Sequence, residues 1–210
     1  MRLKRVGRYL VNQKHYKVNL TADVSKAGVV DCYVDSDWAT DKISRKSTSG
    51  GTLMYAGALV LSYSRTQTTV ATSSAEAELY ATGSGVCEGM LCAAILKELH
   101  EEPSVRVHSD STAGISAQSR LGVGKMKHVE VRHLFVHGLL RSNRMTLNKV
   151  GTFDNTSNIG TKPVDQKTLE ASGYLALGRR QRGRRGLVDA GQRRATTLRR
   201  WRPGPAGQRC

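Results

Sequence analysis

The stretch Val29-Val30-Asp31-Cys32-Tyr33-Val34-Asp35 decides the fold, because its apolar and β-branched residues predict a buried strand that ends in an acid. A second run of this kind, Val105-Arg106-Val107-His108-Ser109-Asp110, also ends in an aspartate. A long helical stretch from about residue 75 to 99 separates them. Because such a helix permits a right-handed crossover, we expect the two strands to lie parallel at the centre of one sheet.

The remaining segments give a mixed α/β order of elements. Two further strand-like runs lie at 52–56 and 59–63, and Gly50, Gly51 and Gly57 punctuate them as in an antiparallel meander. Short helical segments are predicted at 1–20, 112–119, 127–141 and 164–177, and a last strand at 145–150. The sequence therefore predicts an α/β fold with a mixed five-stranded sheet flanked by helices.

The long helix carries signals of its own. Ser73 and Glu76 form a capping-box pattern at its start. Glycines weaken its middle, but an apolar stripe can still run along it through Leu79, Val86, Met90, Ala94 and Leu99.

Three acidic residues stand where these elements end or begin. Asp35 and Asp110 end two strands, and Glu78 lies in the first turns of the long helix, so the fold can bring their carboxylates together. Carboxylate oxygens suit Mg²⁺, and two such ions about 3.5–4 Å apart can activate a water and stabilise a leaving oxygen. The cluster suggests metal-assisted hydrolysis of a phosphodiester, although each acid alone has an ordinary alternative as a turn former or solvated helix residue.

Charge separates the chain into two parts. The formal net charge is +16, and the segment 179–210 is rich in Arg, Gly and Pro with Asp189 as its single acid. We expect this segment to be a disordered basic tail. A basic surface favours a polyanionic partner, and nucleic acid is the commonest one.

Cysteine usage and hydropathy bear on location. The four cysteines include no CxxC pair, which disfavours zinc and a disulfide framework and predicts a reducing, intracellular protein in the cytoplasm or nucleus. No apolar run approaches the roughly 20 residues of a membrane span, so we expect no membrane partner.

Seven short motifs follow one another between residues 29 and 178. They are Asp35-Ser36-Asp37-Trp38-Ala39, Arg45-Lys46-Ser47-Thr48-Ser49-Gly50, Ser62-Tyr63-Ser64-Arg65-Thr66-Gln67, Ser73-Ser74-Ala75-Glu76-Ala77-Glu78, Ser109-Asp110-Ser111, Lys127-His128-Val129-Glu130-Val131-Arg132-His133 and Thr161-Lys162-Pro163. The series resembles the RNase H domain of copia-type retrotransposon Pol polyproteins. The resemblance implies that residues 29–178 are an RNase H-like domain and that 1–28 are a remnant of the connection from the polymerase.

The resemblance assigns catalytic roles to Asp35, Glu78 and Asp110 as ligands of two Mg²⁺ or Mn²⁺ ions. Asn158 stands where the family has a fourth acid; its amide oxygen can still coordinate Mg²⁺ but brings no negative charge. Asp154, four residues earlier, is another candidate for that place. The implied activity is endonucleolytic cleavage of RNA in RNA–DNA hybrids during reverse transcription, with the hybrid and the reverse transcriptase portion of Pol as partners.

Two alternatives remain open at this point. The chain is either the active enzyme or a weakened or inactive remnant that binds nucleic acid or packs on a reverse transcriptase; Asn158 favours the remnant and the three intact acids favour the enzyme. A free-standing RNA-binding protein driven by the basic tail is a third reading.

The loop after the first strand is a candidate phosphate contact. Arg45, Lys46, Ser47 and Thr48 offer point charges and hydroxyls that suit backbone phosphates, and an ordinary solvated turn is the alternative. The neighbouring Asp37 and Asp41 are interpreted as loop acids rather than metal ligands.

Overall fold

The computed structural model describes residues 3–4, 7–8, 11, 20, 22–119 and 130–164. The predicted tail at 179–210, nearly all of the terminal helix predicted at 164–177, and most of the helix predicted at 1–20 lie outside the described residues.

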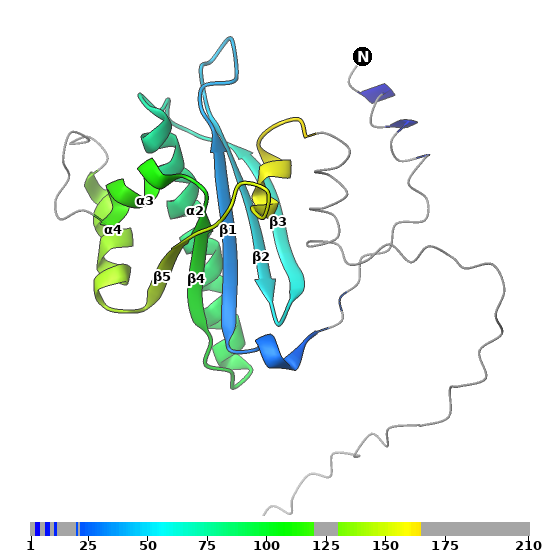
Figure 1. The fold of residues 1–210 in the computed structure, drawn as a ribbon, viewed down its shortest axis with the longest axis vertical. Coiled ribbons are helices and arrows are strands. Elements are labelled where there is room, and N and C mark those ends of the chain that lie inside the picture. Colours follow the sequence, from blue (N-terminus) through cyan, green and yellow to red (C-terminus); the bar gives the residue numbers. More distant parts are fainter. Residues whose placement is uncertain are drawn as a thin grey trace, which may run out of the picture. The chain divides into compact units, whose positions relative to one another are not determined.

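A five-stranded mixed sheet forms the centre of the described part, in the order β3-β2-β1-β4-β5 (Figure 1). The central strand β1 (Val29–Asp37) pairs antiparallel with β2 (Thr48–Tyr55) and parallel with β4 (Ser104–Ser109). The edges are β3 (Ala58–Thr66), antiparallel to β2, and β5 (Met145–Lys149), parallel to β4. The predicted mixed sheet with a parallel centre is confirmed.

Helices cover one face of this sheet. The longest, α2 (Ser74–Glu98), lies across β1, β2 and β4, with α3 (Thr112–Ser119) and α4 (Glu130–Arg141) beside it. A short 3-10 turn, η1 (Val24–Lys26), precedes β1, and a second one, η3 (Thr156–Gly160), contacts β1, β2 and β3.

The helix α2 approaches the sheet closely because two of its glycines face the strands. A Cβ atom at Gly85 would lie 2.3 Å from Cγ1 of Val34, and one at Gly89 would lie 2.5 Å from Sγ of Cys32. Both strand residues are fully buried. The glycines that weaken the helix by propensity thus allow its packing.

The predicted apolar stripe of α2 is wrong at its C-terminal end. Leu79 and Val86 are buried as expected, but Ala94 is exposed and Leu99 is 67% exposed, while Ala93 faces the core. Beyond Val86 the buried residues of α2 are Gly89 and Ala93, small residues that hydropathy does not single out. By length and composition alone α2 could cross a membrane, but it is the core helix of this sheet.

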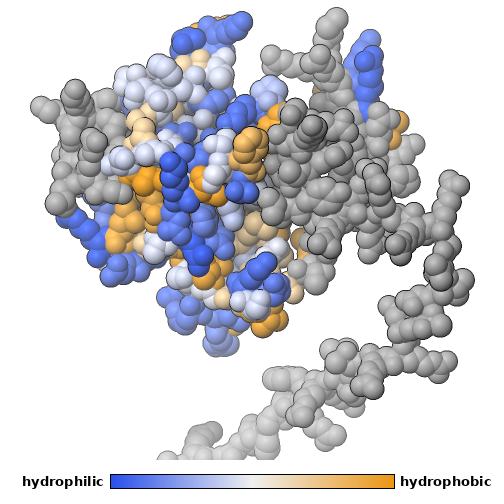
Figure 2. Space-filling model, viewed as in Figure 1, coloured by the Kyte–Doolittle hydropathy of each residue, from blue (hydrophilic) through white to orange (hydrophobic). Residues whose placement is uncertain are grey.

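The prediction that Gly50 and Gly51 separate the strands is wrong, because both residues lie inside β2. A Cβ at Gly51 would lie 2.2 Å from Cζ of Tyr63, its cross-strand partner on β3, so the tyrosine ring occupies the space over the glycine. The face of the molecule seen in Figure 2 is mainly hydrophilic, and hydrophobic residues gather on the side of α4 and β5.

Candidate active site

Neighbouring strands place four residues in a row on the sheet face opposite α2. Asp35 of β1 pairs with Gly50 of β2, which in turn pairs with Ser64 of β3. Asp110 directly follows the end of β4, the parallel neighbour of β1. Because paired residues point to the same face, the two aspartates sit side by side at the carboxyl ends of the central strands.

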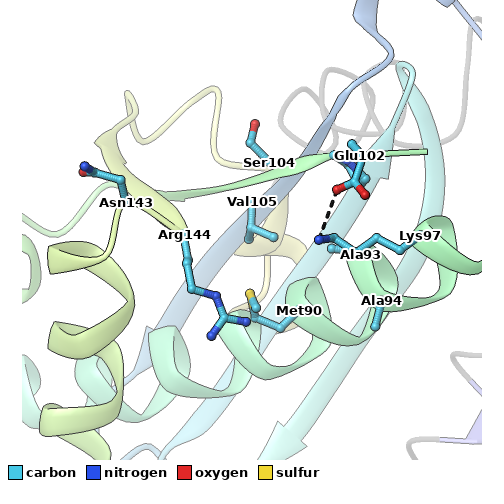
Figure 3. Close-up of a pocket in the computed structure, with 10 residues that line it drawn as sticks. Met90, Ala93, Ala94, Lys97, Glu102, Ser104, Val105, Asn143 and Arg144 are labelled. Carbon is cyan, nitrogen blue, oxygen red and sulfur yellow. Dashed lines mark ion pairs between the residues drawn. The ribbon is translucent and has the colours of Figure 1, made fainter. Parts of the chain in front are cut away.

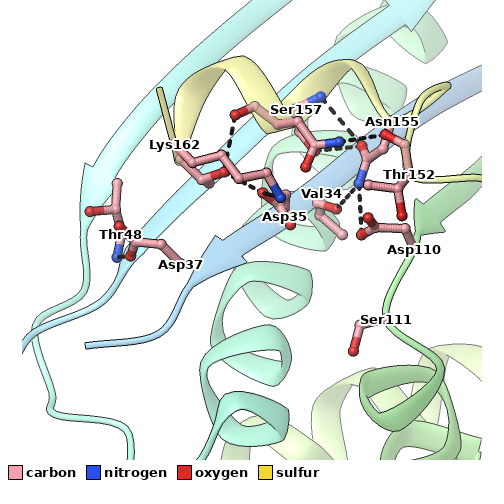
Figure 4. Close-up of polar contacts among 12 residues, drawn as sticks. Val34, Asp35, Asp37, Thr48, Asp110, Ser111, Thr152, Asn155, Ser157 and Lys162 are labelled. Carbon is pink, nitrogen blue, oxygen red and sulfur yellow. Dashed lines mark hydrogen bonds and ion pairs between the residues drawn. The ribbon is translucent and has the colours of Figure 1, made fainter. Parts of the chain in front are cut away.

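The segment 155–162, which contains η3, crosses this row (Figure 4). Its first residue, Asn155, is almost fully buried. The Asn155 amide nitrogen donates to the carbonyl oxygen of Val34 at 3.0 Å and to Oδ1 of Asp110 at 3.1 Å. Its Oδ1 accepts from the hydroxyl of Ser157 at 2.6 Å, which fixes the start of η3. Asn155 thus ties β1, Asp110 and η3 together.

The end of the same segment engages Asp35. The hydroxyl of Thr161 donates to Oδ2 of Asp35, and Nζ of Lys162 lies 3.6 Å from that oxygen. Asp35 is 3% exposed, and burial raises the pKa of its carboxyl; Thr161 and Lys162 act against this rise, and the negative charge of Asp110 adds to it.

The close approach of η3 to the sheet depends on a second glycine contact. A Cβ at Gly50 would lie 2.7 Å from the carbonyl oxygen of Ser157 and 2.8 Å from Cγ2 of Thr161. On the β3 side, the hydroxyl of Ser64 donates to the carbonyl of Gly160 at 2.5 Å. Any larger residue at position 50 would lift the segment away from Asp35.

Glu78 approaches the aspartates from the start of α2. The helix begins after Ser73, whose hydroxyl accepts from the backbone N–H of Glu76 at 3.2 Å, as the capping pattern predicts. The Glu76 carboxylate accepts from the backbone N–H of Thr72 at 2.8 Å and, on its other oxygen, from the hydroxyl of Tyr80 at 2.9 Å. These contacts fix the first turn, from which Glu78 projects.

The Glu78 side chain is buried, and its Oε2 atom has no hydrogen-bond partner. Burial, and after it the charges of Asp35 and Asp110, raise the pKa of Glu78 to about 7 against hydrogen bonds to Ser36 that lower it. The negative charges of Asp35 and Asp110 thus reach Glu78, and the Glu78 carboxyl is partly protonated near neutral pH.

Asn158 lies in η3 and is 3% exposed. Its amide nitrogen donates to the carbonyl of Thr152 at 2.6 Å, and its Oδ1 is buried without a hydrogen-bond partner. Asp154 is exposed; the pKa of Tyr33 is raised mainly by burial, and the charge of Asp154 adds only the smallest contribution. Of the two candidates for the fourth place, Asn158 is therefore the one inside the fold.

The donor set suits a divalent cation in chemistry, since it offers carboxylate oxygens and a buried acceptor on Glu78 that lacks a partner. The arrangement is less suited: within residues 22–119 and 130–164, no three His, Cys, Asp or Glu side chains are placed so that they could hold one ion. Asp35 and Asp110 instead each accept a hydrogen bond from a donor of their own chain. The catalytic and metal roles of the acids stay predictions.

The predicted phosphate loop joins β1 to β2. Arg45 is exposed and has a left-handed backbone, with φ of 56°, and Lys46 is half-buried. Ser47, by contrast, is fully buried and its hydroxyl accepts from the backbone N–H of Ala39 at 3.0 Å. In this conformation the Ser47 hydroxyl is not accessible to a phosphate. The next residue, Thr48, is half-buried.

The two acids near this loop serve its structure, as interpreted from the sequence. Asp37 accepts from the backbone N–H of Thr48 and from the hydroxyl of Thr40. Asp41 accepts from the backbone N–H of Ile43 at 3.0 Å and from the hydroxyl of Ser44 at 2.6 Å. These hydrogen bonds hold the loop at Asp37 and again around Asp41.

A pocket of about 320 Å³ lies away from the acids, at the start of β4 (Figure 3). Met90 and Val105 form part of its apolar lining, and Lys97 and Glu102 at its rim form an ion pair of 3.1 Å. Its position does not connect it to the row of aspartates.

Sequence reasoning missed Asn155 and the contact between Gly50 and η3. Asn155 precedes a short polar segment without hydrophobic periodicity, so nothing marked it as a helix cap. The one available signal was the sequence Asn155-Thr156-Ser157. An asparagine side chain can hydrogen-bond to the residue two positions later, and this arrangement is common in turns.

Comparison with known proteins supports the reading of the motifs. The chain is 28% identical over 141 residues to a retrovirus-related Pol polyprotein from transposon TNT 1-94 of Nicotiana tabacum, and 27% identical over 172 residues to one from transposon RE1 of Arabidopsis thaliana. The matches cover 66% and 80% of this chain but 10% and 12% of the polyproteins. The chain thus spans about a tenth of the length of these relatives.

Two further comparisons concern a shorter relative and a solved structure. The chain is 40% identical over 90 residues to the secreted RxLR effector protein 161 of Plasmopara viticola, which covers 42% of this chain and 61% of that protein. The solved structure of LC11-RNase H1, isolated from compost, superposes with a TM-score of 0.50 at 13% identity, covering 64% of this chain and 93% of that chain.

No family model matches the chain. The sequence similarity and the shared fold nevertheless agree with the motif order and with the mixed sheet. The chain is therefore similar in sequence to the Pol polyproteins of plant transposons, and its described part has the fold of an RNase H domain.

Proposed function

We propose that the domain hydrolyses the RNA strand of RNA–DNA hybrids, as the RNase H portion of a retrotransposon Pol polyprotein. One observation carries the proposal: Asp35, near the end of β1, neighbours Asp110, which directly follows β4, and the charges of both act on Glu78 of α2. Relatedness to Pol polyproteins supplies the biological setting, in which the reverse transcriptase portion is the expected partner.

Asp35, Glu78 and Asp110 would hold divalent cations, Mg²⁺ or Mn²⁺, with Asn158 as a neutral fourth donor. Such ions supply an activated water and stabilise the leaving oxygen of the phosphodiester. The protein's own part would be to keep Asp35 and Glu78 buried and Asp110 partly buried, within electrostatic reach of one another.

Recognition of the hybrid would rest on its shape, its phosphates and its 2′-hydroxyls rather than on base sequence. Arg45 and Lys46, on the loop beyond β1, would contact phosphates; the exposure of Arg45 and the position of the loop after the strand that carries Asp35 support this. Ser47 and Thr48 would support the loop from within.

A second candidate is a remnant that binds hybrid without cutting it. Asn158 favours it, because the site then has three carboxylates, and so do the contacts that Asp35 and Asp110 make with their own chain.

The deciding experiment is cleavage of a labelled RNA–DNA hybrid by the full chain in Mg²⁺ or Mn²⁺, with single- and double-stranded RNA as controls. The enzyme should cut the hybrid alone, and Asp110→Asn should abolish the cut. Hybrid binding without cleavage in either metal would establish the remnant instead.

A further inference from the structure

We propose that Lys162 is a built-in counter-cation of the acidic site, which competes with a divalent metal ion for Asp35. The proposal rests on the proposed function in that it concerns the same acids. It concerns a different property, however, namely how the site is neutralised when no metal is bound.

The first observation is the position of the ammonium group. Nζ of Lys162 lies 3.6 Å from Oδ2 of Asp35, whose side chain is 4% exposed, whereas the Lys162 side chain is 47% exposed. The carboxylate is therefore fixed inside the fold, and the cation reaches it from the solvent on a flexible stem. A group placed in this way can leave without disturbing the sheet.

The second observation is an unsatisfied acceptor in the same site. Oε2 of Glu78 is buried and has no hydrogen-bond partner, although Glu78 lies within the electrostatic reach of Asp35 and Asp110. A buried carboxylate oxygen without a donor is costly, so the site is only partly satisfied by the chain's own donors. An ion that displaced Lys162 would bind Asp35 in a site where Glu78 still offers an acceptor without a donor.

The third observation is that the chain holds Lys162 in place. The backbone N–H groups of Thr161 and Lys162 both donate to the carbonyl of Asn158, at 3.2 and 3.3 Å. The Thr161 hydroxyl fixes the same Asp35 oxygen that Lys162 approaches. The turn that ends η3 thus presents the ammonium group to Asp35 rather than leaving its place to chance.

Competition follows from these contacts. A cation that binds Asp35 must separate it from Lys162, so the lost ion pair is subtracted from the free energy of metal binding. Removing the ammonium group should therefore tighten metal binding, whereas a variant that keeps the positive charge should not.

The test is titration of the full chain with Mn²⁺ alone, followed by calorimetry and by the electron paramagnetic resonance signal of free Mn²⁺. Lys162→Met should bind Mn²⁺ about threefold to tenfold more tightly than the unmodified chain, the range that a partly exposed ion pair of roughly 1 kcal/mol allows. Lys162→Arg should bind as the unmodified chain does. Lys97→Met is the matched control, since it removes one charge from an ion pair at the other end of the sheet.

Equal or weaker Mn²⁺ binding by Lys162→Met overturns the proposal, and so does equal tightening by Lys97→Met, which would show a general charge effect. Absence of Mn²⁺ binding in every variant overturns it as well. The proposed function is judged separately, by hybrid cleavage that depends on Asp110. An enzyme that cuts the hybrid while Lys162→Met leaves Mn²⁺ affinity unchanged would keep the function and reject the counter-cation.

Discussion

Two glycines of α2 allow the packing of helix on sheet to be measured with a single kind of substitution. Gly83 and Gly85 are two residues apart in the same helix. A Cβ atom at Gly83 would meet nothing within 4 Å, whereas one at Gly85 would lie 2.3 Å from Cγ1 of Val34. Replacement by alanine therefore changes the helix propensity equally at the two positions, but it introduces a close contact in the core only at Gly85.

The expected magnitudes follow from this contrast. Alanine in place of glycine stabilises a helix interior by about 1 kcal/mol, and this gain applies to both variants. At Gly85 the new methyl group also overpacks the core, at a cost of about 1–3 kcal/mol. Val34 cannot give way easily, because it is fully buried and its β-branched side chain is stiff. Gly83→Ala should thus raise the free energy of unfolding by about 1 kcal/mol, and Gly85→Ala should lie about 1–3 kcal/mol below it.

The assay is urea denaturation of the full chain, followed by far-ultraviolet circular dichroism. Val34→Ala in the Gly85→Ala background supplies a further check, since removal of the clashing methyl groups should recover part of the loss. Equal stability of the two alanine variants, or greater stability of Gly85→Ala, would refute the close approach of α2 to β1.

Three other predictions concern the site. The folded pKa of Glu78, about 7, lies above its reference value of 4.5, so its contribution to stability is complete below about pH 4.5 and is lost as the pH rises to about 7. Glu78→Gln should flatten this loss when the thermal unfolding of the metal-free chain is measured against pH. An unchanged slope would contradict the burial of the acid. Asn158→Asp should lower the metal-free Tm, because it removes the amide donor to the carbonyl of Thr152, yet raise hybrid cleavage in Mg²⁺; unchanged cleavage would count against a role for this position. Arg45→Gln should weaken hybrid binding and reduce the slope of log affinity against log salt by about 1. Ser47→Ala should lower stability and leave that slope unchanged, because its hydroxyl accepts from the backbone of Ala39. The opposite pattern would exchange the roles of the two residues.

The sequence was sufficient for the central strands because their signals are local. In β1 and β4, buried β-branched residues alternate with more exposed ones, and the length of the intervening helix permits a parallel crossover. The same local reading failed for the C-terminal half of α2, where the buried residues include Gly85, Gly89 and Ala93. Close packing rather than hydropathy decides that face, and packing depends on the partner strand.

The candidate site divides in the same way. The ends of the strands mark Asp35 and Asp110 in the sequence, because the carboxyl ends of parallel strands meet at one edge. The donors that hold them, Asn155 and Thr161, come from a segment whose 3-10 conformation rests on tertiary contacts with β2. No periodicity marks such a segment, so the sequence indicates the acids and not their partners.

The distance along the chain between the acids and their donors has a consequence for the order in which the site is completed. Asn155 lies 45 residues after Asp110, and Thr161 lies 126 residues after Asp35. A chain that emerges from the ribosome therefore presents both aspartates before the groups that hydrogen-bond to them. Until η3 has docked over Gly50, the acids have only solvent and dissolved cations as counter-charges, so the last described segment to be synthesised also decides when the site closes.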